Sequence, residues 1–280
     1  MCCTFFESKL SDTILYAAES ELEGRRVHVM AYQNRAKNLA KGPNAMLLPI
    51  PAAKPLTPDN MLDTRLFKRI LSHYVTTYEA AIPRPQAFGI GKDMLLSTPA
   101  KAEVFERGSF TVVLAQDARL IPAALARVPE HRRPAPNRAI FSAYAKHYPG
   151  WHMALCCYDG AIEAEPMVFW YEPLFPKRLF APALDAHDGN PPDLNRRVHR
   201  DHYVFFAAKQ AKRGILVDKE RLVNTIPLPH QPLFVDHFAG AHLTGAYPNG
   251  DFWLDVQDLN EEVLGFETLP PPGVTASAMS

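Results

Sequence analysis

Two adjacent cysteines, Cys2 and Cys3, follow Met1 and lead into a β-prone stretch. Cysteine is small enough for the initiator methionine to be removed, so we expect Cys2 to become the first residue of the mature chain. An N-terminal cysteine joins a thiol nucleophile to an α-amino group, whose pKa near ~8 lets it act as a general base. The opening therefore predicts amide-bond hydrolysis by the Cys2 thiol.

Such chemistry needs supporting groups. A thiolate near neutral pH requires a positive charge nearby, and Arg26 is among the nearest cations in the sequence. A tetrahedral intermediate needs hydrogen-bond donors, for which Asn34 and Asn44 at expected strand ends are candidates. The alternative interpretation is ordinary turn chemistry for the arginine and asparagines. For Cys2 the alternative is a small buried residue at the start of a strand.

The C-terminal third is rich in histidine and aspartate, which suggests a different chemistry. His199, His202, His237 and His242 are candidate ligands of a two-His-one-carboxylate metal site. His199 and His202 would face the same side only on a helix. Because this spacing matches no specific metal motif, structural histidines remain the alternative.

Composition excludes several classes of function. Lys+Arg and Asp+Glu both number 30, so no net basic charge favours nucleic acid as a partner. No apolar run is long enough to cross a membrane. Phosphate-loop, dinucleotide-binding, serine-hydrolase and zinc-protease motifs are missing, and no cofactor is predicted. The four cysteines form two vicinal pairs, which do not have the spacing of a zinc site.

The element pattern predicts an α+β fold, a mainly antiparallel β-sheet with a few covering helices. Proline clusters separate the elements. Expected strands are 4–10, 13–20, 26–33, 45–50, 109–115, 151–158 paired with 167–172, 203–207, 214–217 and 251–256; expected helices are 57–75, 117–127 and 137–148. We expect one domain over 1–268, with a sub-boundary, if any, near 185–195, and a flexible tail over 269–280.

Two stretches resemble an uncharacterised bacterial family, domain of unknown function 2330. They are Cys2-Cys3-Thr4-Phe5-Phe6 and Asn44-Ala45-Met46-Leu47-Leu48-Pro49-Ile50-Pro51. The segments 108–115 and 144–155 add to the likeness, which covers about the first two-thirds of the chain. The resemblance implies a shared fold and no established activity.

The Met-Cys opening is also similar to cysteine-type N-terminal nucleophile hydrolases, such as choloylglycine hydrolases and class II glutamine amidotransferases. That resemblance implies Cys2 as nucleophile. Choloylglycine hydrolases place an Arg and then an Asp on the second strand, whereas the corresponding region here, 17–22, has no Arg before Arg25.

The sequence thus predicts an amide-bond hydrolase that uses Cys2 on a small-molecule or peptide substrate. The alternatives are a non-enzymatic binding or scaffold protein, whose protein partner is left open, and a protein with a His/Asp metal site. Because the N-terminus lacks the basic and apolar regions of a secretory signal, the expected compartment is the cytoplasm.

Overall fold

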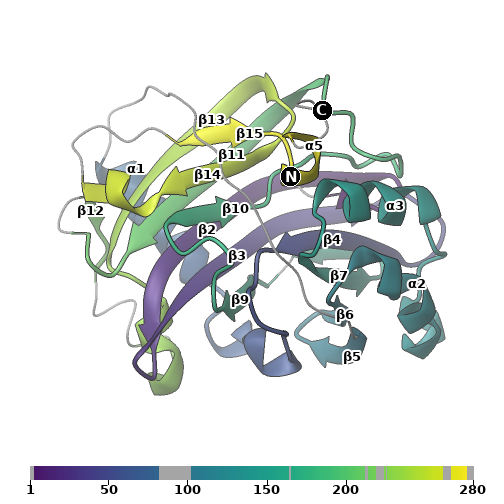
Figure 1. Ribbon diagram of the computed structural model, residues 1–280, viewed down its shortest axis with the longest axis horizontal. Coiled ribbons are helices and arrows are strands. Elements are labelled where there is room, and N and C mark those ends of the chain that lie inside the picture. The colour runs from purple at the N-terminus through teal and green to yellow at the C-terminus, as the bar shows by residue number, and fades with distance from the viewer. Residues whose placement is uncertain are drawn as a thin grey trace.

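In the computed structural model of the chain, antiparallel β-sheet dominates and a few helices cover it, which confirms the predicted α+β class (Figure 1). The structure describes residues 3–81, 102–163, 165–211, 214–218, 224, 226–260 and 266–275. Among these residues, no helix is long and apolar enough to cross a lipid bilayer.

The largest sheet has seven strands. Its order is β12 (Ile215–Leu216), β13 (His237–Pro248), β11 (Arg197–Ala208), β2 (Ser8–Leu22), β3 (Arg25–Asn38) and β8 (Ala161–Glu163), with β9 (Met167–Tyr171) also paired to β3. All of these pairs are antiparallel except β2 with β11. The tight β2–β3 turn places Glu23 and Gly24 at positive φ.

Two smaller sheets complete the β-structure. The five-stranded sheet runs β1 (Cys3–Thr4), β4 (Asn44–Ile50), β7 (His152–Tyr158), β6 (Phe110–Ala115) and β5 (Ala102–Arg107). The three-stranded sheet runs β10 (Arg178–Ala181), β14 (Asp251–Asp255) and β15 (Glu267–Leu269). In Figure 1 the long strands β2 and β3 cross the molecule between β11–β13 and the β4–β7 sheet.

The helices are short. The α-helices are α1 (Ile70–Ala81), α2 (Ile121–Ala124), α3 (Arg138–His147) and α5 (Pro272–Thr275). The 3-10 helices are η1 (Pro58–Asn60), η2 (Thr64–Leu66), η3 (Ala118–Leu120), η4 (Leu125–Arg127), η5 (Glu130–Arg132), η6 (Leu228–Leu233) and η7 (Val256–Asn260). Asn137 caps α3 by accepting a hydrogen bond from the Ile140 amide.

The seven-stranded sheet is buried on both faces, as alternation along its strands shows. On β2, Tyr16 and Ala18 belong to one hydrophobic cluster, whereas Leu15 and Ala17 belong to the other. The first cluster lies under α1, η2 and η6, and the second joins the two smaller sheets and α3. The first cluster's side of the sheet is called the α1 face below, and the second cluster's side the inner face.

The structure corrects several predicted elements. The expected helix from residue 57 begins at Ile70, because Thr57 and Asp63 instead cap 3-10 turns. The strands predicted at 151–158 and 167–172 exist, but they do not pair with each other: β7 lies between β4 and β6, and β9 pairs with β3. The 199–202 segment is extended in β11 rather than helical.

Candidate functional site

The N-terminal strand lies between two parts of the chain. Cys2 is outside the described residues, and the description begins at Cys3, which is buried and pairs with Leu47 of β4. On the other side of β1, the Thr4 amide donates a 2.8 Å hydrogen bond to the Ala186 carbonyl oxygen. The residue next to Cys2 is therefore held beside the 185–187 segment.

Asn44 closes the turn that follows this strand. Its Oδ1 accepts hydrogen bonds from the amides of Phe6 (3.0 Å) and Ala45 (2.8 Å). Its Nδ2 lies within hydrogen-bond distance of Phe6 O (3.1 Å), Ser8 Oγ (2.9 Å) and Asn38 Oδ1 (3.1 Å). Because these protein acceptors occupy the amide, Asn44 positions the N-terminal turn.

Asn34 and Arg26 lie elsewhere on β3. Asn34 is buried and donates from Nδ2 to the Tyr32 hydroxyl at 3.0 Å. Arg26 pairs with Glu21 near the β2–β3 turn, whereas Ser8 lies at the opposite end of β2. Thirteen residues of strand separate the two ends, a length of about 40 Å at the usual rise per residue. The structure therefore does not bring Arg26 to the N-terminal strand.

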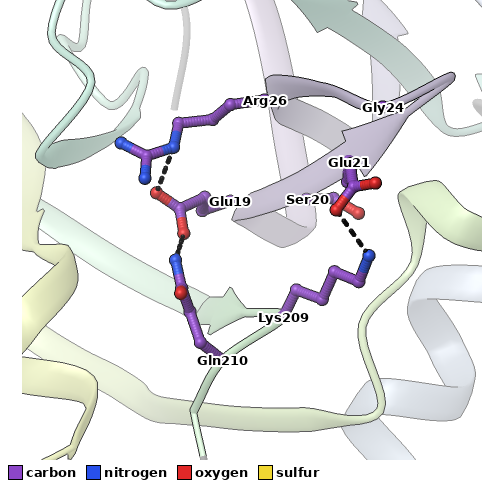
Figure 2. Close-up of a pocket in the computed structure, with 7 residues that line it drawn as sticks. All are labelled: Glu19, Ser20, Glu21, Gly24, Arg26, Lys209 and Gln210. Carbon is purple, nitrogen blue, oxygen red and sulfur yellow. Dashed lines mark hydrogen bonds and ion pairs between the residues drawn. The ribbon is translucent and has the colours of Figure 1, made fainter.

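Arg26 instead lines a pocket of about 450 Å³ at the turn of the hairpin (Figure 2). Its Nε lies 3.4 Å from Oε2 of Glu19, and the other oxygen of that carboxylate accepts a hydrogen bond from Gln210. Lys209 Nζ contacts Glu21 Oε2 at 2.8 Å across the same pocket. Glu19 is almost fully buried, so Arg26 and Gln210 satisfy its carboxylate there.

A larger cavity, of about 630 Å³, lies beside the N-terminal turn and the 185–199 segment. We call it the N-terminal cavity. Its acidic lining residues are Glu7, Asp185, Asp188 and Asp193, and its basic and imidazole lining residues are His187, Arg196, Arg197 and His199. The segment predicted as a sub-boundary thus forms a wall of this cavity.

Asp185 and His187 form a pair in that wall. His187 Nε2 lies 2.5 Å from Asp185 Oδ1. Burial acts to raise the pKa of the Asp185 carboxyl, but the contact with His187, followed by nearby positive charge that includes Arg200, outweighs it, so the pKa lies below its ordinary value. The Asn249 side chain holds the backbone here, with Oδ1 accepting from the Asp185 amide at 2.8 Å and Nδ2 donating to its carbonyl oxygen at 2.9 Å.

The sequence analysis did not predict the Asp185–His187 pair, although the two-residue spacing indicates it. In an extended segment, residues two apart point to the same side, so Asp185-Ala186-His187 places a carboxylate beside an imidazole. The two side chains are in contact, but His187 Nε2 forms no well-aligned hydrogen bond, so the pair is an ion pair when the imidazole is protonated.

The four candidate metal histidines are spread over two faces of the sheet. His199 and His242 belong to the α1 face, but His199 pairs with Ala246, four residues from His242, a separation of about 13 Å along the strand. His202 lies on the inner face, where burial lowers its pKa to about 2. His237 is five residues from His242 on β13, so their side chains point to opposite faces.

His242 has other partners. Its Nε2 lies 2.8 Å from Asp201 Oδ1, and its ring stacks on Tyr203 with centroids 4.1 Å apart. Over the described residues, no three His, Cys, Asp or Glu side chains are grouped so as to hold a metal ion.

No family model matches the chain. No curated protein matches it either. Solved structures of baculovirus P35 show a distant likeness. One crystal structure of P35 has a TM-score of 0.42 at 15% identity and covers 91% of this chain and 92% of P35.

Two further P35 structures match over a smaller part. A mutated P35 after caspase cleavage gives a TM-score of 0.39 at 14% identity, over 70% of this chain and 66% of that chain. P35 in its complex with caspase-8 gives 0.41 at 13% identity, over 75% of this chain and 66% of that chain. These structures belong to neither family that the N-terminal residues resemble, so both resemblances stay predictions.

Proposed function

We propose that this chain is a binding protein that takes a charged polypeptide segment of a partner protein into the N-terminal cavity. The observation that carries the proposal is the cavity itself. Its volume of about 630 Å³ falls within the range of ligand sites, and its walls carry both carboxylates and basic groups.

The charges of the lining favour a polypeptide over an apolar ligand. Glu7 and Arg196 are exposed at the cavity, so their charges are available to opposite charges on a partner. Complementary charges across an interface mainly set specificity and the association rate. A segment with both acidic and basic side chains matches such a wall.

Affinity capture from a lysate of the source organism, with the full chain as bait, tests the proposal. The cavity variant combines Glu7→Lys with Arg196→Glu. The matched control combines Glu130→Lys with Arg69→Glu, two exposed positions that do not line the cavity. Both variants make the same changes of charge and leave the net charge unaltered.

We expect a partner at about one copy per bait, with recovery reduced about tenfold in the cavity variant, since each lost charge pair weakens binding. The control should recover as much as the wild type. Equal recovery by both variants, or no stoichiometric partner, would contradict the proposal.

A second candidate is the amide-bond hydrolase with Cys2 as nucleophile. One observation favours it: the Asp185–His187 pair lies on the segment bonded to β1, next to the residue that follows Cys2. An imidazole beside a carboxylate is a common base for a thiol nucleophile. In this version His187 replaces the α-amine as base. Arg26 takes no part, because it lies at the far end of the β2–β3 hairpin, and Asn44 acts only by holding the N-terminal turn.

The thiol itself tests this candidate. Intact mass first establishes whether Met1 is removed. The rate of Cys2 alkylation against pH should then give a thiol pKa below the ordinary ~8.5, and His187→Ala should return it toward that value. A Cys2 thiol with an ordinary pKa in both proteins would exclude His187 as its partner.

A further inference from the structure

Arg200 is a fully buried cation on the inner face of β11. Its Nη2 donates to the carbonyl oxygens of Gly250 at 2.9 Å and Pro248 at 3.2 Å. Its guanidinium carbon lies 4.5 Å from the ring centroid of Phe252. These contacts hold the side chain in one place and use one of its three nitrogens.

The other two nitrogens, Nε and Nη1, are buried and have no hydrogen-bond partner among the residues that the structure describes. Nor does Arg200 form an ion pair with any described carboxylate, and burial lowers its pKa to about 10. Buried charges in proteins are normally paired, because an unpaired one loses its hydration without compensation.

The nearest carboxylates are already occupied. Asp185 and Asp251 are close enough to act on the charge of Arg200 without contacting it. Asp251 accepts hydrogen bonds from the Tyr148 hydroxyl at 2.6 Å and from the Ala183 and Leu184 amides. Asp185 contacts His187. Nε and Nη1 of Arg200 are therefore available to a hydrogen-bond acceptor on a bound ligand.

Arg200 does not itself line the N-terminal cavity, but it lies behind residues that do. Val198, two residues before Arg200 and on the same face of β11, lines the cavity, as does Asp185. Thr13 pairs with His202 on the neighbouring strand, about 8 Å from Arg200 between Cα atoms by strand geometry. The buried Thr13 hydroxyl also has no described hydrogen-bond partner, so further polar binding capacity lies close to the free nitrogens.

We propose that Arg200, assisted by the Thr13 hydroxyl, binds an oxyanion, a carboxylate or a phosphate, that enters through the N-terminal cavity. Charge-assisted hydrogen bonds from arginine to oxyanions are among the strongest in proteins. The inference rests on the proposed function in one respect, because it takes the cavity as a binding site. It adds that the segment bound there presents an acidic group to Arg200.

Calorimetric titration of the full chain tests the site without any partner. The probes are sodium phosphate and sodium acetate, with ionic strength held constant by sodium chloride. We expect saturable binding of one anion per chain. Arg200→Met should weaken it at least about tenfold, since a hydrogen bond to a charged group contributes that much. The control Arg69→Met removes an exposed cation that does not line the cavity and should change the affinity less than about twofold. The tighter of the two probes identifies the source of the oxyanion.

Thr13→Val keeps the shape of the side chain and removes only the hydroxyl, so it remains informative if Arg200→Met does not fold. We expect it to weaken the anion about threefold to tenfold with an unchanged circular dichroism spectrum. No saturable binding of either probe, or equal affinity in wild type and both site variants, would overturn the inference. Anion binding without partner capture would contradict the proposed function while leaving this site intact.

Discussion

Asn44 and Phe6 bind each other through both backbone groups of Phe6: the Asn44 Oδ1 accepts from the Phe6 amide at 3.0 Å, and its Nδ2 lies 3.1 Å from the Phe6 carbonyl oxygen. Thirty-eight residues of chain separate the two. This clamp joins the start of β4 to the turn after β1, and so fixes the backbone that borders the N-terminal cavity.

The clamp predicts a large cost for Asn44→Ala. The substitution leaves buried donors and acceptors of the turn unpaired, which costs about 3 kcal/mol in the free energy of unfolding. Urea denaturation followed by circular dichroism measures it. Asn190→Ala, an exposed position that also lines the cavity, should cost less than about 0.5 kcal/mol. Equal costs at the two positions would show that the clamp does not stabilise the fold.

The described thiols should not react in the folded protein. Cys3, Cys156 and Cys157 are fully buried, and burial raises the pKa of Cys157 to about 12. Iodoacetamide near neutral pH, followed by peptide mass spectrometry, should leave these three unmodified until denaturant is added. Rapid native alkylation of any of them would contradict the buried placement.

Acid should destabilise the protein through neutral buried histidines. Burial, followed by the charge of Arg26, lowers the pKa of His28 from 6.5 to about 3. Below pH 6.5 the unfolded chain binds a proton that the folded chain excludes. As the pH decreases from 6.5 toward 3, this group therefore lowers the free energy of unfolding by about 1.4 kcal/mol per pH unit. His28→Asn should remove that part of the slope, as measured by urea denaturation at several pH values. The exposed His131→Asn should retain it, and identical slopes in all three proteins would count against the assignment.

Asp251 should make the folded protein less stable as the pH rises, which is the opposite of the effect of His28. Burial raises the pKa of its carboxyl above the ordinary 3.8, against the hydrogen bonds from Tyr148 and two amides. A raised acid pKa gives stability that is complete below 3.8 and is lost as pH rises through the folded value. The Asp251→Asn variant has no carboxyl to ionise at this position, so it does not lose this stability. Its free energy of unfolding should therefore rise relative to that of the wild type between about pH 4 and pH 7. A constant difference would mean that Asp251 titrates normally.

Local patterns predicted much of the fold. The strand predicted at 26–33 lies within β3, and the α3 helix begins one residue after its predicted start, where Asn137 is the cap. Alternation and capping are local signals, so one sequence reveals them. Strand partners are not local, which is why β7 and β9 were wrongly paired. No strand was predicted over β13, because Gly240 and Gly245 interrupt its β-prone residues. At Gly240 any side chain would meet Phe205, whose Cδ1 lies 2.3 Å from the place of a Cβ atom.

The candidate site could be predicted only in part. Asn44 lies beside the N-terminal turn, where the sequence analysis expected it to act. Arg26 lies far from the N-terminal strand because the β2–β3 hairpin is long, and hairpin length is not a local feature of the sequence. His187 and Asp185 could be found from their spacing, whereas their closeness to Cys3 depends on a contact between residues far apart in the sequence. Nothing in the sequence around Arg200 sets it apart, since it stands between His199 and Asp201. Its burial follows from the inner face of β11, which no local pattern specifies.

Photo-crosslinking from inside the N-terminal cavity shows whether the partner protein binds there. A photoreactive amino acid placed at Arg196 lies in the cavity lining, and one placed at Glu130 lies on the exposed surface outside it. We expect the captured partner to crosslink from position 196 and not from position 130, through a peptide with charged side chains. Crosslinking from position 130 alone, or from neither position while the partner is still captured, would contradict it.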